Sequence, residues 1–299
     1  MLTEAEAWLL QEIRSGNQDG WQQLVDRFQG RLLAFARRQL PQSADADDIV
    51  QETFLSFLQT LSKFRESSTL ETWLFQILRR RVADFFRRRG SKSEVILCGE
   101  LIADSSTGAG LSAEPKDHSA SWYIRRDEER QSDYLALTTA LLGEAEKLKR
   151  DERFEDLQVI DLLLFAQRRN RDVAEQLGLD EKAVALKKFR FIEKVRDALP
   201  QSARQAVEAD ATADDLLTSL WADFRPSCPK RTTLGKFQLG TLKPAWDDYV
   251  EFHLSSLGCR FCTASLDDLE QLAAASESDS RIPLRNRIME STVGFFRPD

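Results

Sequence analysis

Residues 45–90 read DADDIVQETFLSFLQTLSKFRESSTLETWLFQILRRRVADFFRRRG. Apolar side chains recur at helical spacing between residues 50 and 61, and the acidic opening favours a helix start. The polar tripeptide SST breaks this period, and a second amphipathic helix is predicted from about Trp73. Trp73, Arg80 and Arg87 are spaced by seven residues, so they share one side of that helix. The segment therefore combines an acidic helix, a polar loop and a basic helix that begins with an aromatic residue.

The basic helix has the composition of a surface for separated nucleic-acid strands. Arginines at helical spacing supply cations along a backbone, and rings such as Phe64 and Trp73 supply faces or pockets for unstacked bases. The alternative is a solvated basic face on which Trp73 is a packing residue. The helix alone leaves both interpretations open.

This order of parts resembles region 2 of the sigma factors of bacterial RNA polymerase, especially the extracytoplasmic-function (ECF) group. The resemblance rests on the acidic helix, on the Phe64-Arg65 pair and on Trp73-Leu74. It implies that the acidic helix binds the basic clamp helices of the largest polymerase subunit, through Asp45, Asp48, Gln51, Glu52 and Phe54.

The same resemblance implies a site for the promoter −10 element. The loop at residues 64–72 would hold a flipped base, and the basic helix would follow the separated strand. Arg80 stands where relatives often carry Asn, so the resemblance does not fix a −10 sequence preference. The expected contacts are Phe64, Arg65, Ser67, Ser68, Thr69, Trp73, Gln76, Arg79, Arg80 and Arg87.

Length and composition place these helices in a larger helical protein. A chain of 299 residues suggests two or three domains, and its 13 glycines and 8 prolines are few enough to favour an all-α fold. The formal net charge of −7 is unlike that of proteins that coat nucleic acid without selectivity. Local basic clusters instead suit a small DNA footprint beside an acidic protein-binding surface.

Several classes of protein are disfavoured by what the sequence lacks. The N-terminus MLTEAEAWLL has no secretory signal pattern, and no apolar run approaches the ~20 residues that span a bilayer. Four cysteines, two of them in a CxxC pair, fit a reducing cytoplasm and metal binding better than a disulfide framework. With two histidines and no catalytic constellation, we expect a cytoplasmic protein that is not an enzyme and does not bind membranes.

The remaining segments suggest a serial arrangement of domains. Residues 3–40 read as two amphipathic helices that complete a four-helix unit. Cys98 and His118 lie in a Gly- and Ser-containing linker and have no neighbouring ligand, so an incidental role is favoured over metal binding. The expected boundaries are 1–92 for the region 2 domain, 93–121 for a linker, 122–200 for a helix-turn-helix domain, 201–224 for a second linker, 225–274 for a small zinc-binding helical domain and 275–299 for a tail.

The helix-turn-helix is predicted from NRDVAEQLGLDEKAVALKKFRFIEKV, which begins at Asn170. Ala174, Gly178 and Val184 stand at the offsets of this motif, and Asp180 can cap the second helix. An ordinary helical hairpin with a basic face is the alternative. The motif resembles sigma region 4, which reads the −35 element, although Lys188 and Phe191 replace the usual Leu and Ala. The residues expected at −35 DNA are Lys182, Lys187, Lys188 and Arg190.

The C-terminal part contains a set of soft and imidazole ligands. Cys228, His253, Cys259 and Cys262 would close a tetrahedral structural Zn²⁺ site. The order of these residues resembles the zinc-binding anti-sigma domain, except that five residues rather than three separate His253 from Cys259. A redox-active or metal-free dithiol and plain structural cysteines remain the alternatives.

Together these features predict a sigma factor of ECF type that directs promoter-specific initiation. Its expected partners are core RNA polymerase and promoter DNA, and the C-terminal domain is expected to contact the sigma domains within the same chain and regulate them. The alternatives are a helix-turn-helix regulator without initiation activity and a thiol- or metal-sensing interaction protein. The sequence does not decide whether the tail folds back through Ile288, Phe295 and Phe296.

Overall fold

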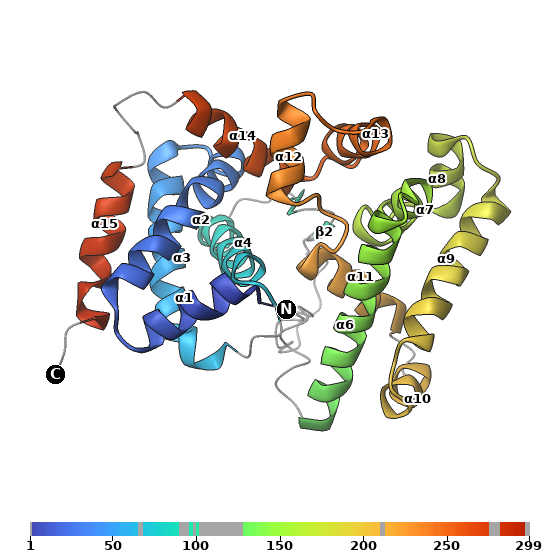
Figure 1. Cartoon of the computed structure of the whole chain (residues 1–299), viewed down its shortest axis with the longest axis horizontal. Coiled ribbons are helices and arrows are strands. Elements are labelled where there is room, and N and C mark those ends of the chain that lie inside the picture. The colour runs from blue at the N-terminus through green and yellow to red at the C-terminus, as the bar shows by residue number, and fades with distance from the viewer. Residues whose placement is uncertain are drawn as a thin grey trace. The chain divides into compact units, whose positions relative to one another are not determined.

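The computed structural model describes residues 2–64, 68–89, 96–97, 100–101, 128–209, 213–274 and 282–296. These residues are almost entirely helical, which confirms the all-α prediction (Figure 1). The exception is one antiparallel pair of two-residue strands, β1 (Ile96–Leu97) and β2 (Glu100–Leu101). Arg65, Ser67, Cys98, His118 and most of the predicted linker 93–121 lie outside the described residues.

The chain forms two compact units that differ from the serial domains expected from the sequence. The first unit contains residues 1–95, 230–240 and 259–299, and the second contains residues 96–229 and 241–258. The segment 225–274 is therefore not a compact domain by itself. Its helices have apolar faces that pack within one unit or the other.

Four helices near the N-terminus build the core of the first unit: α1 (Glu4–Arg14), α2 (Gln18–Gln39), α3 (Ser43–Thr60) and α4 (Leu70–Arg88). A short 3₁₀ turn, η1 (Leu61–Lys63), follows α3. Thr3 and Glu6 form a capping box that satisfies backbone donors at the start of α1. Trp21, Phe54 and Phe57 meet in the buried centre, where Trp21 is edge-on to Phe54 and stacked on Phe57.

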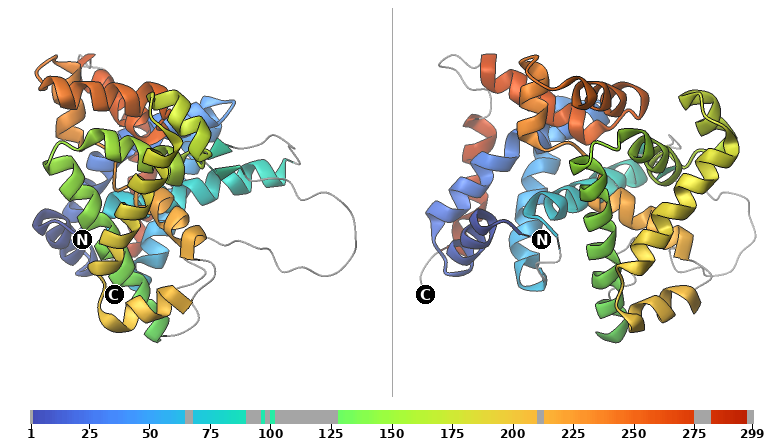
Figure 2. Two further views of the ribbon diagram at one scale, coloured as in Figure 1. Left: turned by 90° about the vertical axis from the view of Figure 1, so that its right-hand side faces the viewer. Right: turned by 45° about the vertical axis from the view of Figure 1, so that its right-hand side comes forward.

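Helices from the C-terminal part complete this unit: α12 (Arg231–Gln238), α14 (Arg260–Ala274), α15 (Ile282–Thr292) and the 3₁₀ turn η4 (Val293–Phe295). Phe261 of α14 stacks on Phe35 of α2 with ring centroids 4.8 Å apart and packs edge-on against Phe75 of α4. Arg38 of α2 donates two hydrogen bonds to the carboxylate of Asp267, at 2.6 and 2.8 Å. In the right-hand view of Figure 2, α14 and α15 lie beside the N-terminal helices; α14 contacts α2, and α15 contacts α2 and α3.

The second unit contains the predicted helix-turn-helix. Its described helices are α6 (Glu128–Arg150), α7 (Phe154–Ile160), the π-helical turn η2 (Asp161–Phe165), α8 (Asn170–Leu177), α9 (Glu181–Asp197), α10 (Gln201–Ala209), α11 (Ala213–Phe224), α13 (Pro244–Glu251) and the π-helical turn η3 (Phe252–Ser256). Gly178 ends α8 with φ +65°, a left-handed conformation that glycine adopts without strain. Val184 and Ala174 are buried where α8 and α9 meet. Asp180 precedes α9, but its side chain makes no capping hydrogen bond, contrary to the prediction.

The prediction of a linker at residues 201–224 was wrong, apart from the short helix expected at its end. Helices α10 and α11 occupy most of this segment. Leu217, Leu220 and Trp221 recur at helical spacing and are buried, and Trp221 packs edge-on against Phe191 with ring centroids 5.5 Å apart. The segment is otherwise polar and acidic, so an apolar face of only three residues did not stand out in the sequence.

Among the described residues, no helix is at once long and apolar enough to cross a membrane.

Candidate functional site

The outer face of α3 carries carboxylates that each have an arginine partner within the first unit. Asp45 Oδ2 lies 3.5 Å from Nη1 of Arg89, the residue that follows α4. Glu52 Oε2 lies 3.6 Å from Arg81 Nη1 of α4. The face is therefore negative but already countered by intramolecular cations, so a basic partner would have to exchange with these arginines.

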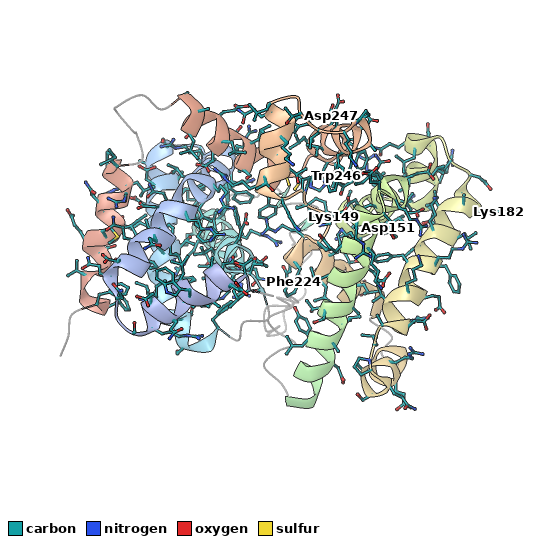
Figure 3. All side chains as sticks on the ribbon, in the orientation of Figure 1. Lys149, Asp151, Lys182, Phe224, Trp246 and Asp247 are labelled. Carbon is teal, nitrogen blue, oxygen red and sulfur yellow. The ribbon has the colours of Figure 1, made fainter. Side chains whose placement is uncertain are left out.

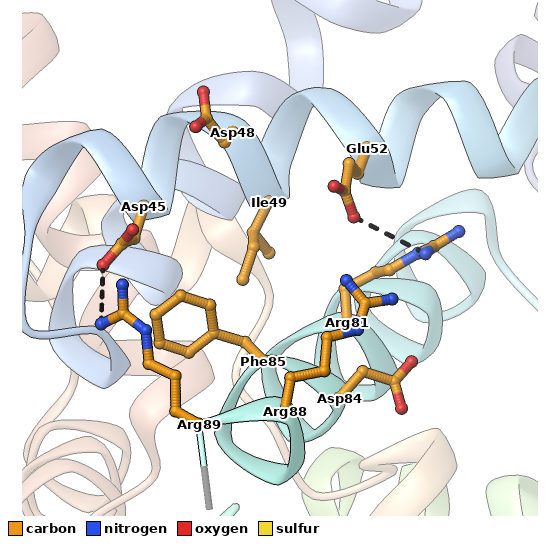
Figure 4. Close-up of a pocket in the computed structure, with 9 residues that line it drawn as sticks. All are labelled: Asp45, Asp48, Ile49, Glu52, Arg81, Asp84, Phe85, Arg88 and Arg89. Atoms are coloured by element: carbon orange, nitrogen blue, oxygen red, sulfur yellow. Dashed lines mark ion pairs between the residues drawn. The ribbon is translucent and has the colours of Figure 1, made fainter.

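A shallow pocket of about 260 Å³ lies between this face of α3 and the C-terminal half of α4 (Figure 4). Ile49 and Phe85 supply its apolar surface, and the Arg89 guanidinium lies 4.3 Å from the centre of the Phe85 ring. Such a pocket suits a long side chain with an apolar stem and a cationic end, such as Lys or Arg. Its lining residues are Asp45, Asp48, Ile49, Glu52, Arg81, Asp84, Phe85, Arg88 and Arg89.

Four of the five residues predicted to bind the polymerase reach the surface of α3. Asp48 and Glu52 are exposed, and Asp45 and Gln51 are half-buried. Phe54 is fully buried against Trp21, with ring centroids 5.7 Å apart. Its place is in the core under the acidic face, where it supports the helix. The periodicity of α3 contains this signal, since Phe54 shares its side with Val50, Phe57 and Leu58.

The aromatic residues predicted for the −10 site form one cluster. Phe64 stacks on Trp73 with ring centroids 4.4 Å apart and an interplanar angle of 17°. Phe57 lies 4.8 Å from Trp73 on the buried side. Phe64 is buried and Trp73 is half-buried, so in this conformation the stacked pair presents part of Trp73 to solvent. The pair is therefore both a packing element and a partly accessible ring surface.

The polar residues of the predicted loop have structural roles that composition alone does not show. Thr69 caps α4, because its Oγ1 accepts a hydrogen bond of 3.1 Å from the Thr72 backbone N–H. Ser68 is buried. Arg14, which was not among the residues predicted for this site, donates a 3.3 Å hydrogen bond from Nη2 to the carbonyl of Phe64. These contacts anchor both ends of the loop on the helices.

The basic residues of α4 divide into exposed and buried groups. Arg80 and Arg87 are exposed, and Gln76 is half-buried. Arg79 is only 9% exposed, so its guanidinium is not part of the open basic surface. A further cation, Arg31 of α2, is buried and pairs with Glu71 of α4 at 2.9 Å. Burial lowers the pKa of Arg31, and the charge of Glu71 opposes that shift.

Comparison with known proteins identifies this helical assembly. The family model described as Sigma-70 region 2 matches residues 24–92, which run from within α2 to just beyond α4. Residues 24–92 form a sigma-70 region 2 domain. The resemblance inferred from the acidic helix, the loop and the basic helix is thereby confirmed.

Relatives of the region 2 domain are named as sigma factors. The chain is similar to a probable RNA polymerase sigma factor of Haemophilus influenzae, with 36% identity over 66 residues, or 22% of this chain and 34% of that protein. It is also similar to the ECF RNA polymerase sigma-E factors of Salmonella typhimurium and Escherichia coli, with 35% identity over 69 residues, or 23% of this chain and 36% of each relative. The match spans about a third of the length of these relatives. No solved structure matches the chain.

Outside the region 2 domain, the residues predicted for −35 DNA do not share one environment. Lys182 and Arg190 are exposed on α9, and Lys182 points outward near its start (Figure 3). Lys187 instead forms ion pairs with Glu155, at 2.8 Å, and with Asp156 of α7. Lys188 is half-buried. The exposed side of α9 also carries Leu186 and Phe189, which are 45% and 59% exposed. The prediction for this helix named only basic residues and did not include this apolar pair.

The predicted metal ligands lie close together. The ligand atoms of Cys228, His253, Cys259 and Cys262 all lie within 4.8 Å of one another. His253, Cys259 and Cys262 are buried, and Cys228 is half-buried. The unusual spacing between His253 and Cys259 includes the end of the π-helical turn η3 and Gly258, which has φ +65°. Three thiols and one imidazole form a donor set suited to a metal ion such as zinc.

The buried carboxylate of Asp161 lies close to the imidazole of His253. Asp161 Oδ2 lies 3.8 Å from His253 Nδ1, and Asp161 Oδ1 accepts a 2.9 Å hydrogen bond from Trp221 Nε1. The Tyr249 hydroxyl lies 3.1 Å from Asp161 Oδ2 and 3.0 Å from the carbonyl of Ser227. Metal-binding histidines commonly have a carboxylate of this kind as an outer partner. The residues present therefore fit a metal site in both their donors and their surroundings.

Proposed function

We propose that this protein is an RNA polymerase sigma factor of the ECF type, a cytoplasmic initiation factor without catalytic activity of its own. The observation that carries the proposal is the region 2 domain at residues 24–92, with its acidic α3 face and basic α4. Sigma region 2 combines a polymerase-binding surface with a surface for the opened promoter. This combination favours initiation over a regulator that binds duplex DNA by itself.

In this proposal the two helices have different partners. The basic clamp helices of core polymerase would bind Asp45, Asp48, Gln51 and Glu52 on α3. A basic side chain of that partner would enter the pocket between α3 and α4, where Ile49 and Phe85 contact its stem. Since the arginines of α4 bind phosphates, promoter binding would weaken steeply as the salt concentration rises.

The opened −10 strand would follow α4. Arg80 and Arg87 would bind its backbone, and Trp73 on Phe64 would stack with or wedge beside an unpaired base. Arg65 and Ser67 remain predicted members of this site. The helix-turn-helix of α8 and α9 is proposed to bind −35 duplex through Lys182 and Arg190, and Lys187 would hold α9 against α7.

The test is retention of core polymerase and promoter-specific transcription by the full chain. We expect Asp48→Ala with Gln51→Ala to weaken retention of core enzyme. The matched control Glu4→Ala removes an exposed carboxylate from α1 and should have no effect. If core polymerase does not bind the chain in any form, the proposal is wrong.

We also propose that Cys228, His253, Cys259 and Cys262 hold a structural zinc ion. Bound zinc would cross-link these four side chains and stabilise the fold around them. Support comes from the proximity and burial of the ligands and from Asp161 behind His253. A metal-free redox dithiol at Cys259 and Cys262 is the competing function of the same residues.

Metal analysis separates the two possibilities. Purified protein should contain about one zinc ion per chain, since the four residues form one tetrahedral set. Cys262→Ser should lose most of that zinc, whereas a substitution of Cys98, which is not one of the four predicted ligands, should not. Reversible disulfide formation in protein that contains no zinc would instead support the dithiol.

The C-terminal segments are further proposed to regulate the sigma domains within the same chain. The packing of Phe261 of α14 on Phe35 of α2 supports such a role for α14. A covalently attached segment has a high effective concentration at its binding surface, so modest contacts are enough to bias the equilibrium.

A further inference from the structure

The C-terminal helix α15 packs against α2 and α3 within the first unit (Figure 1). We infer that α15 is a built-in occupant of the acidic α3 surface and competes there with a basic helix of the polymerase. This inference rests on the proposed function, because it concerns access to the same surface. It assigns a role to the tail, which lies beyond the predicted zinc-binding segment 225–274.

Apolar contacts hold α15 in place. Leu284 and Ile288 are buried, as is Thr292 at the end of the helix. Trp21 Nε1 of α2 donates a 2.8 Å hydrogen bond to Thr292 Oγ1. Just beyond the helix, the Phe296 ring stacks on Trp21 with ring centroids 5.9 Å apart. The core residue Trp21 thus supports both α3 and the segment that covers part of α3.

Arginines of α15 pair with carboxylates of the region 2 domain. Arg287 Nη2 lies 3.1 Å from Asp47 Oδ2, and Arg287 Nη1 lies 3.3 Å from Asp48 Oδ1. A second arginine of the helix, Arg285, pairs with Asp26 of α2. One face of α15 therefore combines apolar and cationic side chains, which is the chemistry expected of a basic helix that docks on α3. Asp48 is one of the residues predicted to bind the polymerase.

The exposure of Asp47 and Asp48 shows that α15 covers these carboxylates only in part. Asp47 is 26% exposed, whereas Asp48 remains 67% exposed beside Arg287. An incoming basic partner can therefore meet Asp48 first and then displace Arg287 from both carboxylates. Exposed ion pairs are individually weak and screened by salt, so the exchange begins at these pairs, and the apolar contacts of α15 separate afterwards as the partner helix takes its place.

A purely structural role for α15 is the alternative, in which the helix only shields Trp21 from water. The two roles respond differently to Arg287→Ala, because that change removes the ion pairs but keeps Leu284, Ile288 and Thr292 in place. The matched control is Asn286→Ala, which alters an exposed neighbour on the same helix.

The experiment measures the affinity of full-length protein for core polymerase. Competition predicts that Arg287→Ala binds core enzyme about twofold to fivefold more tightly than the unaltered chain, the range expected when exposed ion pairs are removed. Asn286→Ala should bind like the unaltered chain. If all three chains bind core enzyme equally well, the competition is overturned while the proposed function stands. If none of them binds core enzyme, the proposed function fails and the competition fails with it.

A second measurement follows α15 itself. Hydrogen exchange of the amides of residues 282–292 should speed up when core polymerase is added to the unaltered chain, because the helix is displaced. Unchanged protection of these amides in the saturated complex would overturn the inference, even if the complex forms.

Discussion

Asp161 is a buried carboxylate on which several side chains of the second unit depend. It is fully buried, and it accepts a hydrogen bond from Trp221 Nε1 and contacts the Tyr249 hydroxyl. Removing an acceptor from buried donors costs the desolvation of those donors. We expect Asp161→Ala to lower the free energy of unfolding by roughly 2–4 kcal/mol. Urea denaturation measures this change, and Asp151→Ala, at an exposed position, should change it little. Equal effects of the two substitutions would contradict the role assigned to Asp161.

The ion pair of Lys187 with Asp156 gives a pH-dependent prediction. Burial would raise the pKa of Asp156, but the hydrogen bond and charge of Lys187 outweigh burial and lower it. Burial would lower the pKa of Lys187, but its hydrogen bonds to Asp156 and Glu155 raise it. The contribution of Asp156 is complete above the ordinary carboxyl value of 3.8 and is lost as pH falls through the lowered pKa. The contribution of Lys187 is complete below the ordinary value of 10.5 and is lost as pH rises through the raised pKa.

Replacing Lys187 by Met should therefore destabilise the protein by about 1 kcal/mol near neutral pH. The difference from the unaltered chain should vanish well below pH 3.8, where Asp156 is protonated in both. Denaturation curves of both proteins, near neutral pH and well below pH 3.8, measure this difference in stability. Lys182→Met, on the exposed side of the same helix, serves as the control. A difference that persists in acid would show that the side chain acts through packing rather than charge.

At the scale of the helix, α4 separates into an exposed basic side, which is proposed to bind DNA, and a side that packs in the core. Arg80 and Arg87 are exposed, whereas Arg79 is buried. Substituting Arg80 and Arg87 by Ala should weaken binding of a single-stranded −10 oligonucleotide by the complex with polymerase, about tenfold for the pair, and leave the unfolding free energy nearly unchanged. Fluorescence anisotropy measures the affinity.

Arg79→Ala is the counterpart to these substitutions on the same helix. It should lower the unfolding free energy, because the substitution removes a buried guanidinium with its packing contacts and leaves its polar partners unsatisfied. If it weakened oligonucleotide binding without loss of stability, the division of α4 into two surfaces would be wrong.

The periodicity of the sequence was enough to predict α2, α3, α4, α8 and α9, because each has an apolar stripe broken by polar or glycine residues. It was not enough to assign the roles of single residues on those helices. Phe54 and Arg79 have residue types that suit binding, yet both are buried. Burial depends on which neighbouring helix covers each side, and that information is non-local.

At the scale of the whole molecule, the two units depend on segments far away in the sequence. A chain ending at Ala209 would lose Trp221 from the second unit and Phe261 from the surface of α2 in the first. We expect such a truncation to lower the melting temperature and to bind a hydrophobic dye, because apolar faces of both units become exposed. A chain ending at Ala274 keeps both residues and lacks α15, so its melting temperature should fall less. Equal melting temperatures for the full chain and the Ala209 truncation would contradict these assignments.

The local order of the sequence determined the helical class, the region 2 domain and the set of four residues proposed to bind zinc. These features depend on residues close together in the chain, or on residue types whose chemistry is distinctive, and both can be read without coordinates. The packing of α14 and α15 on the region 2 domain was decided only by the tertiary structure. Arg287 meets Asp47 and Asp48 across some 240 residues of chain, as the separation of these partners shows. No spacing rule predicts that contact, because it depends on which apolar faces fit one another once the chain has folded.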